Sequence, residues 1–193
     1  MTLVLLAGIH DTAARFDPIL PLLGDRPVQA VDLAPADGTH SLANLAQQAD
    51  AAIRAVEGPV DLVGYSLGGL VARYAIQRLG SPVARLVTIA TPHQGTWIAH
   101  GLRNVAGREM RPNSPFLQDL ERDWAETACK VPTLAIWTPF DGIVVPAWNA
   151  RLAGAATIRI PVWRHGDMVT DPRVWAAVLA YLRGGTSQAG PGG

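Results

Sequence analysis

Six short apolar segments, separated by stretches of helical periodicity, are the feature that most restricts the fold of this chain. Segments that are apolar at nearly every position are typical of strands covered on both faces of a parallel sheet. Strands that alternate with helices predict crossover connections and therefore an α/β fold. The expected strands are Leu3–Ala7, Val28–Val31, Val60–Val63, Leu86–Ala90, Thr133–Trp137 and Thr157–Ile160.

Helical patterns lie between these strands. Apolar residues from Leu42 to Val56 recur at helical spacing, and the Gly-Pro pair at 58–59 ends that pattern. Further helices are predicted over 67–79 and over 172–182, where Asp171 is the expected N-cap and Pro172 occupies the first turn. We therefore predict one α/β domain over residues 1–183, with a mostly parallel sheet of about six strands. The Gly-rich tail, 184–193, is expected to be disordered.

Residues 91–130 interrupt the alternation, because they contain no predicted strand and only one helix, around Pro115–Trp124. A connection this long within a compact domain is usually functional. The apolar residues Phe116, Leu117 and Leu120 are either one face of a small lid or the buried face of a packed helix, and the packed helix is favoured. The sequence has no room for a large cap.

Charge and cysteine content exclude several classes of protein. The 16 Lys and Arg residues balance the 16 Asp and Glu residues, which gives no electrostatic reason to expect a nucleic acid or an anionic membrane as partner. The single cysteine, Cys129, cannot form an intrachain disulfide and has no second cysteine with which to bind zinc. Cys129 is expected to be a small buried hydrophobe. We expect neither a cofactor nor a metal, and the oligomeric state is left open.

The N-terminus lacks a basic region, and its apolar run is too short for a signal peptide. No segment reaches the length of a membrane span, so no stable membrane insertion is expected. These observations favour a cytoplasmic protein, although removal of a leader would leave the same pattern.

Residues 64–69 read Gly-Tyr-Ser-Leu-Gly-Gly and contain the pattern G-x-S-x-G. The pattern follows a predicted strand and precedes a predicted helix, which is the context of a nucleophile elbow. A strand that turns sharply into a helix needs glycines on both sides of the serine, because side chains there would clash. The hydroxyl of Ser66 would then project from the carboxyl edge of the sheet, above a helix N-terminus. The alternatives are an ordinary Gly-rich turn or a phosphate-binding loop.

Three motifs in order resemble the lipase and esterase branch of the α/β-hydrolases, in particular compact bacterial lipases with little or no cap. These motifs are the segment 64–69, the Ala-Thr-Pro-His-Gln-Gly-Thr segment at 90–96, and the Asp-Gly-Ile-Val-Val-Pro segment at 141–146. The resemblance extends from Leu3 to about Leu182. It implies a serine hydrolase that acts on carboxylic esters through an acyl-enzyme intermediate.

The resemblance also orders the catalytic triad as serine, acid, histidine. Asp141 follows the fifth predicted strand, and His165 is the one histidine of five that follows the acid. Asp141 is therefore the expected acid and His165 the expected general base. The alternatives are a turn-forming aspartate before Gly142 and a surface histidine. Asp167 matches the spacing of a calcium ligand in some lipases, but a solvated loop aspartate is favoured.

Two backbone N–H groups are expected to form the oxyanion hole. One belongs to Leu67, directly after the nucleophile, and the matching donor in the first loop is Ile9. Relatives usually have a histidine before the glycine of that loop, whereas this chain has Ala7 before Gly8. His93 precedes the acid in the chain, so it is expected to organise its loop and not to transfer protons.

The loops around Ser66 are predominantly apolar, which favours an acyl ester as the small-molecule substrate. A shallow, open site would favour short- to medium-chain esters. A thioesterase, an acyltransferase or a perhydrolase would use the same triad, and a non-catalytic binding module is a further alternative. The residues expected to bind substrate are His10, Phe16, Trp97, Ile143 and Val144.

Overall fold

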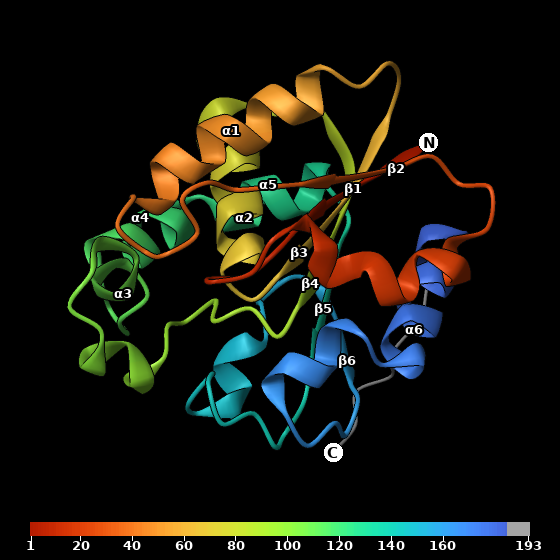
Figure 1. Ribbon diagram of the computed structural model, residues 1–193. Coiled ribbons are helices and arrows are strands. Elements are labelled where there is room, and N and C mark those ends of the chain that lie inside the picture. Colours follow the sequence, from red (N-terminus) through yellow and green to blue (C-terminus); the bar gives the residue numbers. More distant parts are fainter. Residues whose placement is uncertain (185–193) are drawn as a thin grey trace.

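The computed structural model describes residues 1–184 and contains one six-stranded sheet in which all paired strands are parallel (Figure 1). The strand order is β2-β1-β3-β4-β5-β6. The α/β fold is as predicted, and each expected strand is present. The strands are β1 (Thr2–Leu6), β2 (Val28–Val31), β3 (Val60–Tyr65), β4 (Val83–Ile89), β5 (Thr133–Trp137) and β6 (Ala156–Arg159). Beyond Gly184, the predicted tail lies outside the described residues.

The sheet separates two hydrophobic cores, because successive residues of a strand point to opposite faces. In β1, Val4 and Leu6 pack into one core and Leu3 and Leu5 into the other. Helices α1 (Leu42–Arg54) and α2 (Leu67–Leu79) cover the first face, and α6 (Pro172–Leu182) covers the second (Figure 1). The strands at the two edges, β2 and β6, are only partly buried.

The segment from 91 to 130 forms η2 (Trp97–Gly101), α3 (Val105–Glu109), α4 (Pro115–Arg122) and α5 (Trp124–Lys130). On α4, Leu117 and Leu120 are buried in the core, and Phe116 stacks on Tyr74 of α2 with the ring centroids 5.6 Å apart. The favoured alternative of a packed helix is therefore correct, and these residues are not the face of a lid.

Two further features differ from expectation. A 3-10 helix, η1 (Ala13–Leu23), was not predicted, because Pro18 and Pro21 lie inside it and proline interrupts regular helical patterns. Cys129 is exposed, contrary to the expectation of burial, because α5 turns Trp124 toward the core and Cys129 away from it.

The short helices η3 (Ala147–Ala150) and η4 (His165–Val169) complete the fold. Within residues 1–184, no helix is both long and apolar enough to cross a bilayer.

Candidate active site

Ser66 lies at the turn between β3 and α2, at the carboxyl edge of the sheet. Its backbone has φ 53° and ψ −120°, a strained combination for a residue with a side chain. The turn is tight: a Cβ on Gly64 would overlap the backbone of Gly69, and a Cβ on Gly68 would overlap the carbonyl of Leu6. Small residues at these positions let the strand and the helix pass each other and hold the Ser66 hydroxyl in place.

Three side chains from three separate loops form a continuous hydrogen-bonded chain. Ser66 Oγ lies 3.0 Å from His165 Nε2, and His165 Nδ1 lies 2.8 Å from Asp141 Oδ2. A carboxylate can only accept hydrogen bonds, so Nδ1 carries the proton of the neutral ring. Nε2 is then the acceptor for the serine hydroxyl. The structure therefore brings together three side chains that lie far apart along the sequence.

The carboxylate of Asp141 is itself held by the backbone of its own loop. Asp141 is buried, and its Oδ1 accepts hydrogen bonds of 2.9 Å from the N–H groups of Ile143 and Val144. Thr96 Oγ1 donates to the carbonyl of Ile143 at 2.5 Å, so the segment after β4 supports the same loop. These contacts fix the carboxylate against rotation and aim it at His165.

Two backbone donors next to Ser66 are free. The N–H groups of Ile9 and Leu67 make no hydrogen bond within residues 1–184. Leu67 is the first residue of α2, where the helix dipole favours negative charge. The loop with Ile9 lies against the nucleophile, because a Cβ on the neighbouring Gly8 would be 3.3 Å from Ser66 Cβ.

A cavity of about 190 Å³ opens beside Ser66. Of the five residues expected to bind substrate, Ile143 lines this cavity, and Val144 is buried behind it with its N–H bonded to Asp141. His10 and Trp97 are exposed and do not line it. The cavity is lined by Gly8, Ile9, Asp11, Tyr65, Ser66, Ile143 and His165.

The expectation that Phe16 lines the pocket is wrong. Phe16 is fully buried and packs edge-on against Trp175 of α6, with the ring centroids 6.4 Å apart. Its position in η1 turns the ring toward the second core and away from the nucleophile. Asp11 and Tyr65 line the cavity although the sequence did not predict them, and Tyr65 lies within the motif itself.

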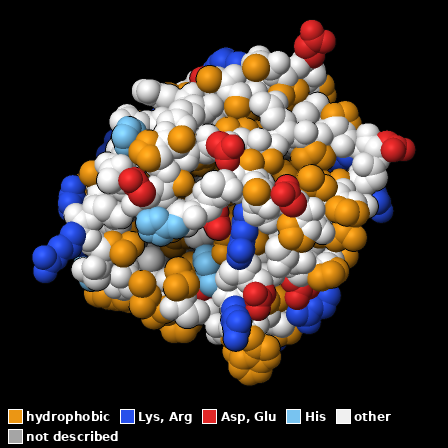
Figure 2. Space-filling view, viewed as in Figure 1, with side chains coloured by type: hydrophobic (Ala, Val, Ile, Leu, Met, Phe, Trp, Pro, Cys, Tyr) orange, Lys and Arg blue, Asp and Glu red, His pale blue; other side chains and the backbone are white. Residues whose placement is uncertain are grey.

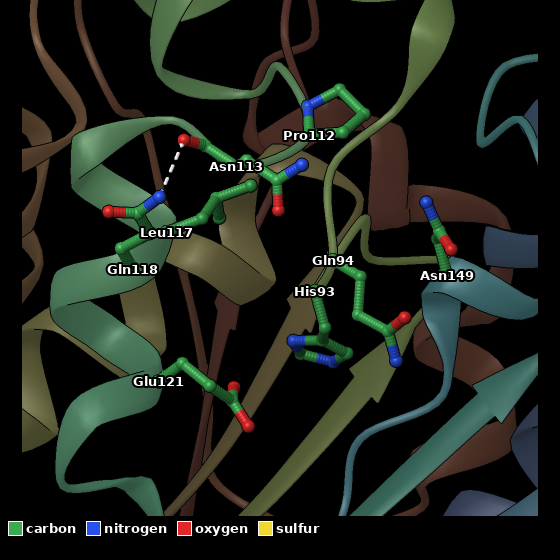
Figure 3. A pocket seen from close by; sticks show the side chains of 8 residues that line it. All are labelled: His93, Gln94, Pro112, Asn113, Leu117, Gln118, Glu121 and Asn149. Atoms are coloured by element: carbon green, nitrogen blue, oxygen red, sulfur yellow. Dashed lines mark hydrogen bonds between the residues drawn. The ribbon is translucent and has the colours of Figure 1, made fainter.

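A larger cavity, of about 450 Å³, lies between α4 and the loop after β4 (Figure 3). It shares no lining residue with the cavity at Ser66. His93 and Glu121 point toward one another across it (Figure 3). His93 Nε2 lies 2.9 Å from Thr88 Oγ1, which ties the loop back to β4. The larger of the two cavities is therefore not the one beside Ser66 and His165.

Acid is expected to destabilise the fold through His93. Burial, and then the positive charge of Arg73, lower the pKa of His93 well below 6.5. The unfolded chain takes up a proton below about pH 6.5 while folded His93 stays neutral, so the free energy of unfolding falls by up to about 1.4 kcal/mol per pH unit. Urea unfolding at pH 7 and pH 5 measures this loss. His93→Gln should remove it, whereas His40→Gln, at an exposed position, should not. Equal losses in all three proteins would contradict the assignment.

Asp167, the alternative calcium ligand, is exposed on the turn after His165. Among residues 1–184, no three His, Cys, Asp or Glu side chains lie close enough together to hold a metal ion. The described chain thus offers Asp167 no set of companion ligands.

Comparisons with known proteins agree with the fold, and one of them also identifies a family. No curated protein sequence matches the chain. Among solved structures, mature lipase BlEst2 of Bacillus licheniformis is 17% identical over 94% of this chain and 91% of its own, with a TM-score of 0.78. A pyrethroid hydrolase from Sphingobium faniae JZ-2 is 17% identical over 97% of this chain and 98% of its own, with a TM-score of 0.66.

A thermophilic esterase from Thermogutta terrifontis is 17% identical over 97% of this chain and 91% of its own, with a TM-score of 0.65. At these identities the likeness establishes the α/β-hydrolase fold. The sequence profile of palmitoyl protein thioesterases matches residues 4–132, which is most of the chain. The chain therefore belongs to the palmitoyl protein thioesterase family, an ester-hydrolase family of the α/β-hydrolase superfamily.

Proposed function

We propose that the protein hydrolyses carboxylic esters, with Ser66 as nucleophile, His165 as general base and Asp141 as the acid that orients the base. One observation carries this proposal: Ser66 Oγ, His165 and Asp141 form an unbroken hydrogen-bonded chain at a strained strand-to-helix turn. A serine hydroxyl is a weak nucleophile by itself, and an adjacent, oriented imidazole is the arrangement that activates it.

In the proposed reaction, Ser66 Oγ attacks the ester carbonyl carbon as His165 Nε2 removes the hydroxyl proton. The carbonyl oxygen becomes an oxyanion, which accepts hydrogen bonds from the N–H groups of Ile9 and Leu67. Asp141 stabilises the imidazolium that forms. The same proton then passes to the leaving alkoxide, and an acyl-Ser66 ester remains. Water, deprotonated by His165, attacks this acyl-enzyme and releases the carboxylic acid.

The proposed substrates are short- to medium-chain acyl esters. The cavity beside Ser66 is about 190 Å³, below the roughly 300–1,000 Å³ that encloses a drug-sized ligand. Basic and acidic side chains are intermixed on the face shown in Figure 2, so no block of one charge selects an ionic substrate there. We expect p-nitrophenyl butyrate to be hydrolysed with a higher kcat/KM than p-nitrophenyl palmitate, when both esters are kept dissolved as single molecules and not as micelles. A strong palmitate preference would contradict this.

Thioester hydrolysis is the second candidate, because the matching family is one of palmitoyl protein thioesterases. The triad chemistry is the same, and the leaving group is a thiolate in place of an alkoxide. Parallel assays of an oxygen ester and a thioester with the same acyl chain separate the two activities. A higher kcat/KM for the thioester would favour the thioesterase over the esterase.

Labelling with a fluorophosphonate tests the activated serine directly. The folded wild-type protein is expected to be labelled at neutral pH, because the reagent captures a serine that a neighbouring base deprotonates. Ser66→Ala and the urea-denatured wild type should both stay unlabelled. A folded wild type that resists the reagent, or a Ser66→Ala protein that is labelled equally well, would overturn the assignment of Ser66.

A further inference from the structure

We infer that Arg15 and Tyr65 are positioning residues for the general base, each holding one of two successive carbonyl groups on the turn that carries His165. The inference rests on the proposed function, because it assigns a purpose to the contacts around the proposed base. Both hydrogen bonds go to backbone carbonyls and not to Ser66 Oγ or to the ring nitrogens of His165, so each residue acts through the turn that carries His165.

Tyr65 connects the nucleophile to the base. It is the last residue of β3, directly before Ser66, and only 2% of its surface is exposed. Its hydroxyl donates a hydrogen bond of 3.2 Å to the carbonyl of His165, and its ring centroid lies 5.2 Å from that of the imidazole. Burial is the main reason that the pKa of Tyr65 lies above its ordinary value, so the hydroxyl remains a donor. A Cβ on Gly8 would be 3.2 Å from this ring, which confines it from the other side.

Arg15 joins the segment after Ile9 to the turn that carries His165. It lies in η1, which follows the loop with Ile9. Its Nη2 donates a hydrogen bond of 2.6 Å to the carbonyl of Gly166, across 151 residues of chain. A Cβ on Gly166 would lie only 2.8 Å from this nitrogen, so the guanidinium packs closely against the turn. Arg15 Nε lies 3.7 Å from Asp11 Oδ1, and Asp11 lines the cavity at Ser66.

These two bonds matter because they act at the first two residues of the turn, ahead of the buried Met168 and Val169 that anchor its other end. His165 begins η4, a 3-10 helix of five residues, and no side chain caps it. Asp141 holds only the ring of His165, whereas Tyr65 and Arg15 hold the backbone on which the ring is mounted. A displacement of about 1 Å between reacting groups can cost about 100-fold in rate, so two anchors on one short turn are expected to affect kcat.

The test is steady-state hydrolysis of p-nitrophenyl butyrate by Arg15→Met, Arg15→Lys and Tyr65→Phe, with kcat and KM measured separately. Arg15→Met should lower kcat about 10- to 100-fold with little change in KM, because the base is displaced while the cavity is kept. Arg15→Lys keeps a donor for the carbonyl of Gly166 and should recover part of kcat. Tyr65→Phe keeps the ring but removes the donor to the carbonyl of His165, and it should also lower kcat with little change in KM.

Arg122→Met, at an exposed position on α4, is the matched control and should retain the wild-type kcat and KM. A wild-type kcat in both Arg15→Met and Tyr65→Phe would overturn the inference, as would a kcat of Arg15→Lys no higher than that of Arg15→Met. If Arg15→Met fails to fold, as judged by its thermal melt, Arg15→Lys and Tyr65→Phe still decide the matter. In either case, fluorophosphonate labelling of the wild type separates failure of this inference from failure of the proposed serine chemistry.

Discussion

Replacement of His165 by Gln is expected to lower kcat for p-nitrophenyl butyrate by about 10⁶-fold, the loss that follows removal of the base from another serine triad. His165 Nε2 lies 3.0 Å from Ser66 Oγ, which is close enough for it to remove the proton of the serine hydroxyl. A glutamine amide can reach the serine but cannot act as a base at neutral pH. The residual rate would come from the oxyanion donors and substrate binding alone. Steady-state assays at high enzyme concentration and over long incubations measure the loss.

His40→Gln is the matched control, because His40 is exposed in the loop between β2 and α1. It removes the same side chain in the same way and should leave kcat unchanged. A decrease of less than about tenfold in His165→Gln, with a thermal melt like that of the wild type, would show that the base lies elsewhere.

The sequence predicts the framework well wherever local pattern and tertiary packing agree. The bounds of α2 and α6 match the predicted helices, because Gly80 ends one and Asp171 with Pro172 begins the other. The strands are found because they are buried on both faces and must be apolar throughout. Ser66, Asp141 and His165 can be chosen as candidates because each lies in the connection that follows a recognisable strand, and parallel strands bring their carboxyl ends to one edge.

The surroundings of the triad are harder to predict, because they depend on how irregular loops fold. Phe16 is expected in the pocket because it is an apolar residue on a loop predicted to surround Ser66, yet η1 turns it into the core against Trp175. No periodic pattern could reveal η1, since Pro18 and Pro21 interrupt it. The bond between Arg15 and Gly166 joins distant parts of the chain and leaves no local signal. Tyr65 is easier to anticipate than Arg15, because it lies inside the motif around Ser66.

Asp141→Asn is expected to lower kcat about 10⁴-fold while the fold is preserved. The reason lies in the four contacts of this carboxylate. Oδ1 accepts from the N–H groups of Ile143 and Val144, and both oxygens lie within 3.0 Å of His165 Nδ1. An asparagine can keep its oxygen on the two backbone donors, and its NH₂ group then faces His165. That NH₂ group can only donate, so it would require Nδ1 to be an acceptor.

The proton of the neutral ring would then sit on Nε2, pointing at Ser66 Oγ, and His165 could no longer remove the serine proton. The variant therefore keeps the contacts that fold the loop and loses the tautomer that performs the chemistry. The thermal melt and kcat measured together test this argument. Asp167→Asn, an exposed aspartate on the turn after His165, should change neither quantity by much. If Asp141→Asn kept more than about a tenth of the wild-type kcat, Asp141 would not be setting the tautomer of the base.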